Sequence, residues 1–158
     1  MIKIKSHSGI YTLTVHQKIN TTLEEAWAFF STPKNLTKIT PAYMGFEITS
    51  DLVDSMRVGQ IITYRVAVLL GIKSSWVTEI THVEKNHFFV DEQRFGPYSM
   101  WHHEHIFELN QGKVWMTDRV SYKMPFGILG HLLHALFVKR QLLDIFNHRY
   151  QTIEKYFR

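Results

Sequence analysis

The chain has 158 residues, of which 45% are hydrophobic and 14% aromatic, a composition typical of one globular domain whose core can enclose a cavity. It contains no cysteine, so disulfides and thiolate metal sites are excluded. The net charge of +4 comes from scattered lysines and arginines, without a basic run interleaved with aromatic residues. We therefore expect no nucleic-acid partner.

The N-terminal segment MIKIKSHSGIYTL alternates apolar and polar residues and lacks the charged-then-apolar pattern of a leader. We therefore expect a cytoplasmic protein that folds as a single domain over residues 1–158. The longest apolar region, Met124–Val138, has about fifteen residues and includes two histidines, so it is too short and too polar to span a bilayer. It either dips into a membrane during lipid pickup or packs over a cavity. The second is favoured, and we expect no stable membrane insertion.

The first predicted strand is Tyr11–Asn20, in which alternate residues from Leu13 onward face inward. Asn20-Thr21-Thr22 then supplies an N-cap for a helix over Leu23–Phe30, whose first-turn acids are favoured by the helix dipole. The segment Lys34–Thr40 predicts a second short helix, which the following proline ends.

Six further strands follow, each bounded by turn residues. They are Phe46–Leu52, Gly59–Leu69, Ile72–Val83, Phe89–Phe95, Met100–Leu109 and Val114–Met124. From Leu129 to Phe157, apolar residues then recur at three- and four-residue intervals, which predicts a long helix with one buried stripe. The basic residues expected on its solvent-exposed face are Lys139, Arg140, Arg149, Lys155 and Arg158.

Grouped strands bracketed by helices are typical of α+β proteins with an antiparallel sheet. We predict a helix-grip fold, in which a curved antiparallel sheet of about seven strands surrounds a long C-terminal helix. Two short helices are expected between strands 1 and 2. At roughly 1.5 Å per residue the long helix spans about 45 Å. It cannot fill a concave sheet at every depth, so we expect an internal cavity.

The pairing of the last two strands follows from the turn signal between them. Closing that turn as a hairpin sets Leu109 opposite Val114 and therefore His105 opposite Asp118. Directly opposed residues on one face of a sheet are neighbours. The hairpin thus predicts an imidazole–carboxylate contact.

The pairing of the preceding two strands adds a second carboxylate. Their connection places Gln93 opposite His103 and Asp91 opposite His105. In this register His105 lies between Asp91 and Asp118, on a face that otherwise carries aromatic and aliphatic side chains. A sheet face with both apolar and ionisable groups indicates a pocket more than a plain core.

Four interpretations of Asp91, His105 and Asp118 remain open. The plainest is a buried hydrogen-bonded network that holds three strands in register. The same groups can instead orient the polar head of a ligand, or His105 can act as a general acid or base. A metal site that adds His103 is a fourth interpretation, which lacks an outer partner for the histidines.

Several segments resemble the SRPBCC superfamily, which includes START, polyketide cyclase and birch-pollen-allergen domains. They are P-K-N-L-T-K-I-T-P (Pro33–Pro41), W-V-T-E-I-T (Trp76–Thr81), F-V-D-E-Q-R-F-G-P-Y-S-M-W-H-H-E-H-x-F (Phe89–Phe107) and D-R-V-S-Y-K-M-P-F-G-I-L-G (Asp118–Gly130). The chain looks most similar to a bacterial ligand-binding branch without established chemistry. The resemblance implies a helix-grip fold whose deep hydrophobic cavity opens near the start of the long helix. It implies no reaction, because superfamily members include carriers, receptors, aromatases and cyclases.

We therefore expect a protein that binds a hydrophobic small molecule or lipid and performs no established catalysis. The alternative is a cyclase, aromatase or dehydratase that acts on a polyketide- or isoprenoid-like substrate, with His105 as acid or base and Asp91 or Asp118 orienting it. No cofactor and no metal are expected, and the sequence carries no signal for an oligomeric state. The expected ligand-binding residues are Trp76, Phe89, Asp91, Gln93, Trp101, His103, His105, Phe107, Asp118, Tyr122, Leu133 and Phe137.

Overall fold

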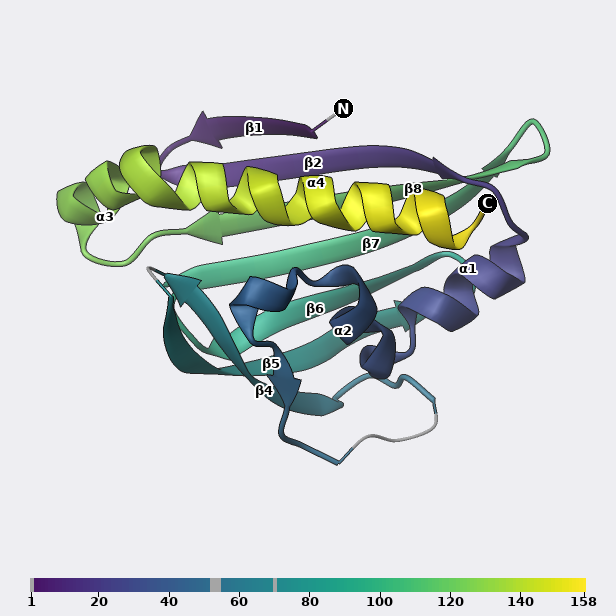
Figure 1. Ribbon diagram of the computed structural model, residues 1–158, viewed down its shortest axis with the longest axis horizontal. Coiled ribbons are helices and arrows are strands. Elements are labelled where there is room, and N and C mark those ends of the chain that lie inside the picture. The colour runs from purple at the N-terminus through teal and green to yellow at the C-terminus, as the bar shows by residue number, and fades with distance from the viewer. Residues whose placement is uncertain (1, 52–54, 70) are drawn as a thin grey trace.

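The protein is an α+β helix-grip structure, as the sequence predicts (Figure 1). The computed structural model describes residues 2–51, 55–69 and 71–158. Within these residues one antiparallel sheet has eight strands in the order β1-β2-β8-β7-β6-β5-β4-β3. The strands are β1 (Ile2–His7), β2 (Ile10–Ile19), β3 (Glu47–Ile48), β4 (Ile61–Leu69), β5 (Ile72–Glu84), β6 (Phe88–Phe95), β7 (Met100–Asn110) and β8 (Lys113–Lys123).

The helices gather on one side of this sheet (Figure 1). Helix α1 (Leu23–Phe30), the 3-10 turn η1 (Pro33–Asn35), the short helix α2 (Leu36–Ile39) and the 3-10 turn η2 (Ala42–Met44) follow β2. The C-terminal helix consists of α3 (Gly127–Leu133), the π-helical turn η3 (His134–Val138) and α4 (Lys139–Tyr156). It runs along the sheet, whereas α2 lies in front of β6 (Figure 1) and α1 packs against β6 and β7.

The strand count differs from the prediction by β1, which pairs with β2 at the edge of the sheet. Ser8 and Gly9 both have positive φ and fold β1 back on β2 in a two-residue turn. The N-terminal alternation is thus a strand, and Ile2 and Ile4 pack against the core. Because this strand comes first, the short helices lie between β2 and β3.

Helix α1 has the predicted bounds because a complete capping box starts it. The hydroxyl of Thr22 accepts a hydrogen bond from the Glu25 N–H at 3.2 Å, and the Glu25 carboxylate accepts one from the Thr22 N–H at 3.4 Å. Trp27 and Phe30 then pack edge-on or tilted against Phe107 of β7. The cap and the aromatic contacts together fix α1 against the sheet.

The strand predicted over Phe46–Leu52 is reduced to β3, and Leu52 lies outside the described residues. After β3 the backbone N–H groups of Thr49 and Ser50 both donate to the same carbonyl, that of Thr63. A regular ladder cannot use one acceptor twice, so the pairing ends there. The other predicted strands are confirmed to within two residues.

The predicted stripe of the C-terminal helix is wrong at its start. Leu129, Leu132, Leu136 and Phe137 are exposed, whereas Gly130, His134 and Val138 face the sheet. The reason is Gly130, because any Cβ at this position would overlap the carbonyl oxygen of Pro125. Only the glycine face can therefore lie this close to the preceding loop, and in this orientation the leucines turn outward.

The buried side chains form two clusters that meet at the middle of the sheet. The first contains Leu13, Val120, Tyr122 and Phe146, among others. The second contains Ile19, Phe89, Phe107, Met116 and Ile153, among others. Along β8 the boundary between the two clusters is Asp118, which lies between Met116 and Val120. Polar groups thus cross the interior where the two clusters meet.

Candidate functional site

The predicted pairing of β7 with β8 is confirmed. Leu109 lies opposite Val114, and His105 lies opposite Asp118. Both partners are buried, with exposed fractions of 4%. The inward alternation of the two strands therefore places an imidazole and a carboxylate side by side inside the protein.

The predicted pairing of β6 with β7 is wrong by two residues, since Asp91 lies opposite His103 and Phe89 opposite His105. The β6–β7 ladder ends at Glu92. The side chain of the next residue, Gln93, forms hydrogen bonds with the β6–β7 loop. Its Nε2 donates to the Tyr98 carbonyl at 2.7 Å, and its Oε1 accepts from the Tyr98 N–H at 3.2 Å. A shift of two residues keeps every side chain on its predicted face, so Asp91 still reaches His105 diagonally.

Two imidazoles and two carboxylates form a closed network in the middle of the sheet. His105 donates from Nε2 to Asp91 Oδ2 at 2.8 Å, and its Nδ1 lies 2.9 Å from Asp118 Oδ1. His103 donates from Nε2 to Asp118 Oδ1 at 3.0 Å, and its Nδ1 lies 3.4 Å from Asp91 Oδ2. The ring of Phe89 stacks on His105 with the ring centroids 4.1 Å apart, a geometry that stabilises a cationic imidazole.

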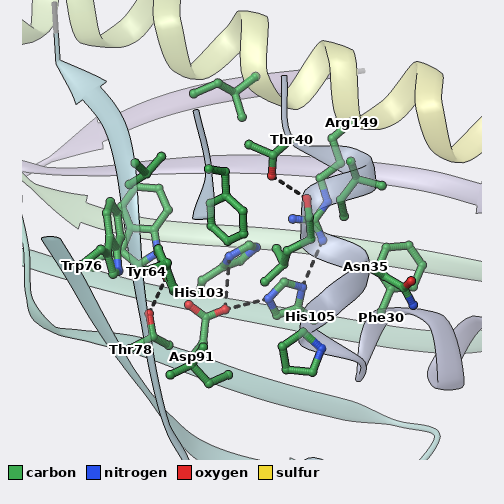
Figure 2. A pocket seen from close by; sticks show the side chains of 18 of the residues that line it. Phe30, Asn35, Thr40, Tyr64, Trp76, Thr78, Asp91, His103, His105 and Arg149 are labelled. Carbon is green, nitrogen blue, oxygen red and sulfur yellow. Dashed lines mark hydrogen bonds and ion pairs between the residues drawn. The ribbon is translucent and has the colours of Figure 1, made fainter. Parts of the chain in front are cut away.

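Arg149 of α4 completes the network, although the sequence analysis placed it on the solvent-exposed face. Its exposed fraction is 7%, and its Nη2 lies 3.3 Å from Asp118 Oδ1 and 3.5 Å from His105 Nδ1. Figure 2 shows Arg149 reaching from α4 toward His105. The spacing to Phe146 and Ile153, which are both buried, was the sequence signal for an inward-facing residue.

The pKa shifts indicate the charge states of the two carboxylates and the two histidines. Burial alone would raise the pKa of Asp118, but Arg149 and the two histidines hold it well below its usual value. Burial likewise opposes the charged form of Asp91, and His103, His105 and Arg149 outweigh it, so its pKa is lowered. Both carboxylates are therefore ionised.

The pKa values of the two histidines shift in opposite directions. Burial would lower the pKa of His105, but its hydrogen bonds to Asp118 and Asp91 raise it. Burial and the neighbouring His105 lower the pKa of His103 despite the same two carboxylates. With His105 charged and His103 neutral, Asp91, Asp118, Arg149 and His105 sum to zero charge. The network is electrically balanced.

A cavity of about 160 Å³ lies between the sheet and the helices, and the network forms part of its wall. Most of the lining is apolar, and Arg149, His103, His105 and Asp91 supply the charged part (Figure 2). The apolar part includes Phe30, Ile39, Met44, Phe46, Val66, Trp76, Ile80, Tyr98, Trp101, Leu142 and Phe146. The long helix contributes lining residues only from Leu142 onward, whereas the resemblance implied an opening near its start.

The cavity brings together half of the residues that the sequence analysis proposed. Those that line it are Trp76, Phe89, Asp91, Trp101, His103 and His105. Gln93, Phe107, Asp118, Tyr122, Leu133 and Phe137 do not line it. Asp118 contacts both imidazoles without lining the cavity. The Gln93 side chain hydrogen-bonds the β6–β7 loop, and Phe107 and Tyr122 are core residues. Phe137 is 45% exposed on the outer side of the long helix.

Asp91, His103 and His105 are the residues best placed to hold a metal, since one ligand atom of each lies within 4.8 Å of the others. Three features oppose a cation there. The raised pKa of His105 favours its protonated form, Asp91 already accepts its hydrogen bond, and the Arg149 guanidinium is adjacent. Protonated imidazole cannot bind a metal, so the geometry fits a hydrogen-bonded network better.

No family model matches the chain, and no curated protein matches it. Solved structures do share its fold. Protein Ms6760 from Mycobacterium smegmatis is 16% identical with a TM-score of 0.67, covering 99% of this chain and 97% of that one. Ginseng major latex-like protein 151 from Panax ginseng is 14% identical with a TM-score of 0.68, covering 95% and 99%. A protein from Rhodobacter sphaeroides is 15% identical with a TM-score of 0.70, covering 99% and 97%. At these identities the likeness shows the helix-grip fold alone.

Proposed function

We propose that this chain is a ligand-binding protein of the bacterial SRPBCC branch that its sequence motifs resemble. Its cavity takes a small, mainly apolar molecule that carries a hydrogen-bond-accepting group. The observation that carries the proposal is the placement of a buried, charge-balanced network in one wall of an otherwise apolar cavity. Apolar walls with a few converging polar groups are typical of ligand sites.

Two unpaired donors indicate what the ligand must supply. Among the described residues, the indole N–H of Trp76 and the Nε–H of Arg149 are buried without a hydrogen-bond partner. Both residues line the cavity. A buried unpaired donor costs about 1–3 kcal/mol, so an acceptor atom on the ligand that pairs with either one would be stabilised. This favours a carbonyl, ether or hydroxyl oxygen over a purely hydrocarbon ligand.

The volume restricts the size of the occupant. The 160 Å³ cavity is smaller than the roughly 300 Å³ at the low end of ligand pockets. A small molecule therefore fits better than a whole lipid, and a longer ligand would extend through the mouth of the cavity.

The enzymatic alternative has weaker support. An acid–base catalyst needs a ring nitrogen that faces the substrate. Both ring nitrogens of His105 already lie within 3.0 Å of carboxylate oxygens, at 2.8 and 2.9 Å. His103 is the better candidate for a base because its pKa is lowered, but its nitrogens face the same two carboxylates.

Native mass spectrometry of the protein purified from its own cells tests the proposal directly. We expect the wild-type protein to carry a copurified small molecule. Trp76→Phe, which removes one donor and keeps an aromatic ring, should lower ligand occupancy, and Lys155→Met, an exposed change on α4, should not. A wild-type protein that has only its polypeptide mass would refute ligand binding. Unchanged occupancy in both Trp76→Phe and Arg149→Met would refute the proposed position of the acceptor.

A further inference from the structure

The start of the C-terminal helix carries a group of exposed apolar side chains, which we call the α3 patch. Ile128 is 89% exposed and Phe126 is 76% exposed, and the other members are more than 40% exposed. The full set is Phe126, Ile128, Leu129, Leu132, Leu136 and Phe137. Monomeric proteins rarely leave large apolar side chains contiguous on one surface, and such patches mark interaction sites.

The patch is held outward by contacts on the opposite side of the same helix. His134 Nε2 pairs with the buried Tyr122 hydroxyl at 2.8 Å, and His131 Nδ1 pairs with the Tyr11 hydroxyl at 2.7 Å. Gly130 fits closely against Pro125, where no Cβ has space. Because these contacts fix the helix rotation, the outward residues cannot turn into the core. Within the described residues the inner face of this helix is covered by the sheet, whereas the α3 patch is not covered.

The patch lies at one end of the molecule, beyond the end of β8 and away from the β7–β8 turn (Figure 1). The charged residues next to it in the sequence are basic. Lys123, Lys139 and Arg140 are exposed, and no acidic residue occurs in the sequence between Arg119 and Leu143. Apolar side chains bordered by Lys and Arg are the pattern of helices that lie in the interface of an anionic bilayer.

We propose that the α3 patch docks the protein on an anionic lipid bilayer. The leucines, isoleucine and phenylalanines enter the interface between headgroups and acyl chains, and Lys139 and Arg140 contact the headgroups. A second copy of this chain fits the patch less well. A twofold contact between identical patches would bring the same basic residues together, where their charges repel.

A pocket beneath the patch also suits a lipid surface. Phe126 and Leu133 line it together with Met124 and other apolar residues. Val68 and Tyr98 line both this pocket and the main cavity, so the two spaces share a wall. Docking at α3 would therefore bring the bilayer close to the wall of the proposed ligand cavity. The docking itself does not depend on a ligand.

Vesicle flotation with the full chain tests the proposal. The vesicles are pure phosphatidylcholine in one arm and equal parts of phosphatidylcholine and phosphatidylglycerol in the other. Wild-type protein should float with the anionic vesicles. The triple variant I128S/L132S/L136S should bind them at least about tenfold more weakly, since it removes three apolar anchors. Leu109→Ser, at an apolar position 63% exposed in the hairpin at the opposite end, is the matched control and should bind like wild type.

A second variant separates charge from apolar contact. K139Q/R140Q should weaken binding to the anionic vesicles by about thirtyfold and leave the patch itself unchanged. Light scattering on the same samples measures the oligomeric state. The proposal is overturned if wild-type protein does not float, or if the triple variant floats as well as Leu109→Ser. It is also overturned if wild type is a dimer that the triple variant dissociates.

Discussion

Removing Arg149 should destabilise the protein because the charge balance of the network depends on it. Arg149→Met keeps most of the side-chain volume and removes the cation that lies 3.3 Å from Asp118 Oδ1. Breaking a buried ion pair costs about 3–5 kcal/mol when one charge is left uncompensated. Asp118 keeps contacts with His103 and His105 at 3.0 and 2.9 Å, so we expect the low end, about 3 kcal/mol.

Urea unfolding followed by tryptophan fluorescence measures this change. For a chain of this size, 3 kcal/mol corresponds to a fall in Tm of about 6–12 °C. Arg140→Met, on the exposed side of the same helix, is the control and should stay within about 0.5 kcal/mol of wild type.

A double-mutant cycle with Asp118→Asn shows whether the loss arises from charge. The neutral amide no longer needs a cation, so the double variant should be more stable than the sum of the single changes by at least about 1 kcal/mol. If the two changes add, or if Arg149→Met unfolds like the control, then Arg149 does not balance the network and the argument for it fails.

The other predictions concern segments around the network. Burial lowers the pKa of His134 from its ordinary 6.5 to about 4. The unfolded chain therefore binds this proton at a higher pH than the folded chain, and the free energy of unfolding decreases as the pH drops from about 6.5 to 4. His134→Gln should therefore reduce the loss in unfolding free energy between pH 6.5 and about 5 by about 1 kcal/mol, allowing for solvent screening, and the exposed His148→Gln should not. Gly130→Ala should lower the free energy of unfolding by at least about 2 kcal/mol, because its Cβ would overlap backbone; unchanged urea unfolding would show that the helix start can shift. Gln93→Ala removes both side-chain bonds to Tyr98 and should cost about 1–2 kcal/mol in the same assay. If the exposed Gln151→Ala lowered the free energy of unfolding equally, the two Gln93 hydrogen bonds would have no specific stabilising role.

The alternation of the strands was enough to find the centre of the site. It assigned Asp91, His103, His105 and Asp118 to one face, and this assignment survives the two-residue error in the β6–β7 pairing. The error arose because turn length was read from residue types alone. The sequence does not show that the Gln93 side chain would replace a ladder bond.

The long helix was harder to predict because it is apolar on more than one side. Three- and four-residue spacing from Leu129 onward fits an inward stripe as well as an outward one, and only the close fit of Gly130 decides between them. Arg149 was assigned to solvent because it is charged. Its partner Asp118 is on strand β8, far from Arg149 in the sequence, so the burial of Arg149 follows from the tertiary structure and not from local pattern.

The charge balance also restricts the chemistry of the proposed ligand. Ionised Asp91 and Asp118 are offset by Arg149 and protonated His105, which leaves no net charge for a ligand to neutralise. An anionic head would therefore add an uncompensated charge to a buried site, unless His103 took up a proton at the same time. A neutral acceptor requires no such change and can pair with the Nε–H of Arg149 or the indole N–H of Trp76, which have no partner in the described part of the chain. The network thus favours a ketone, ester or alcohol over a carboxylic acid.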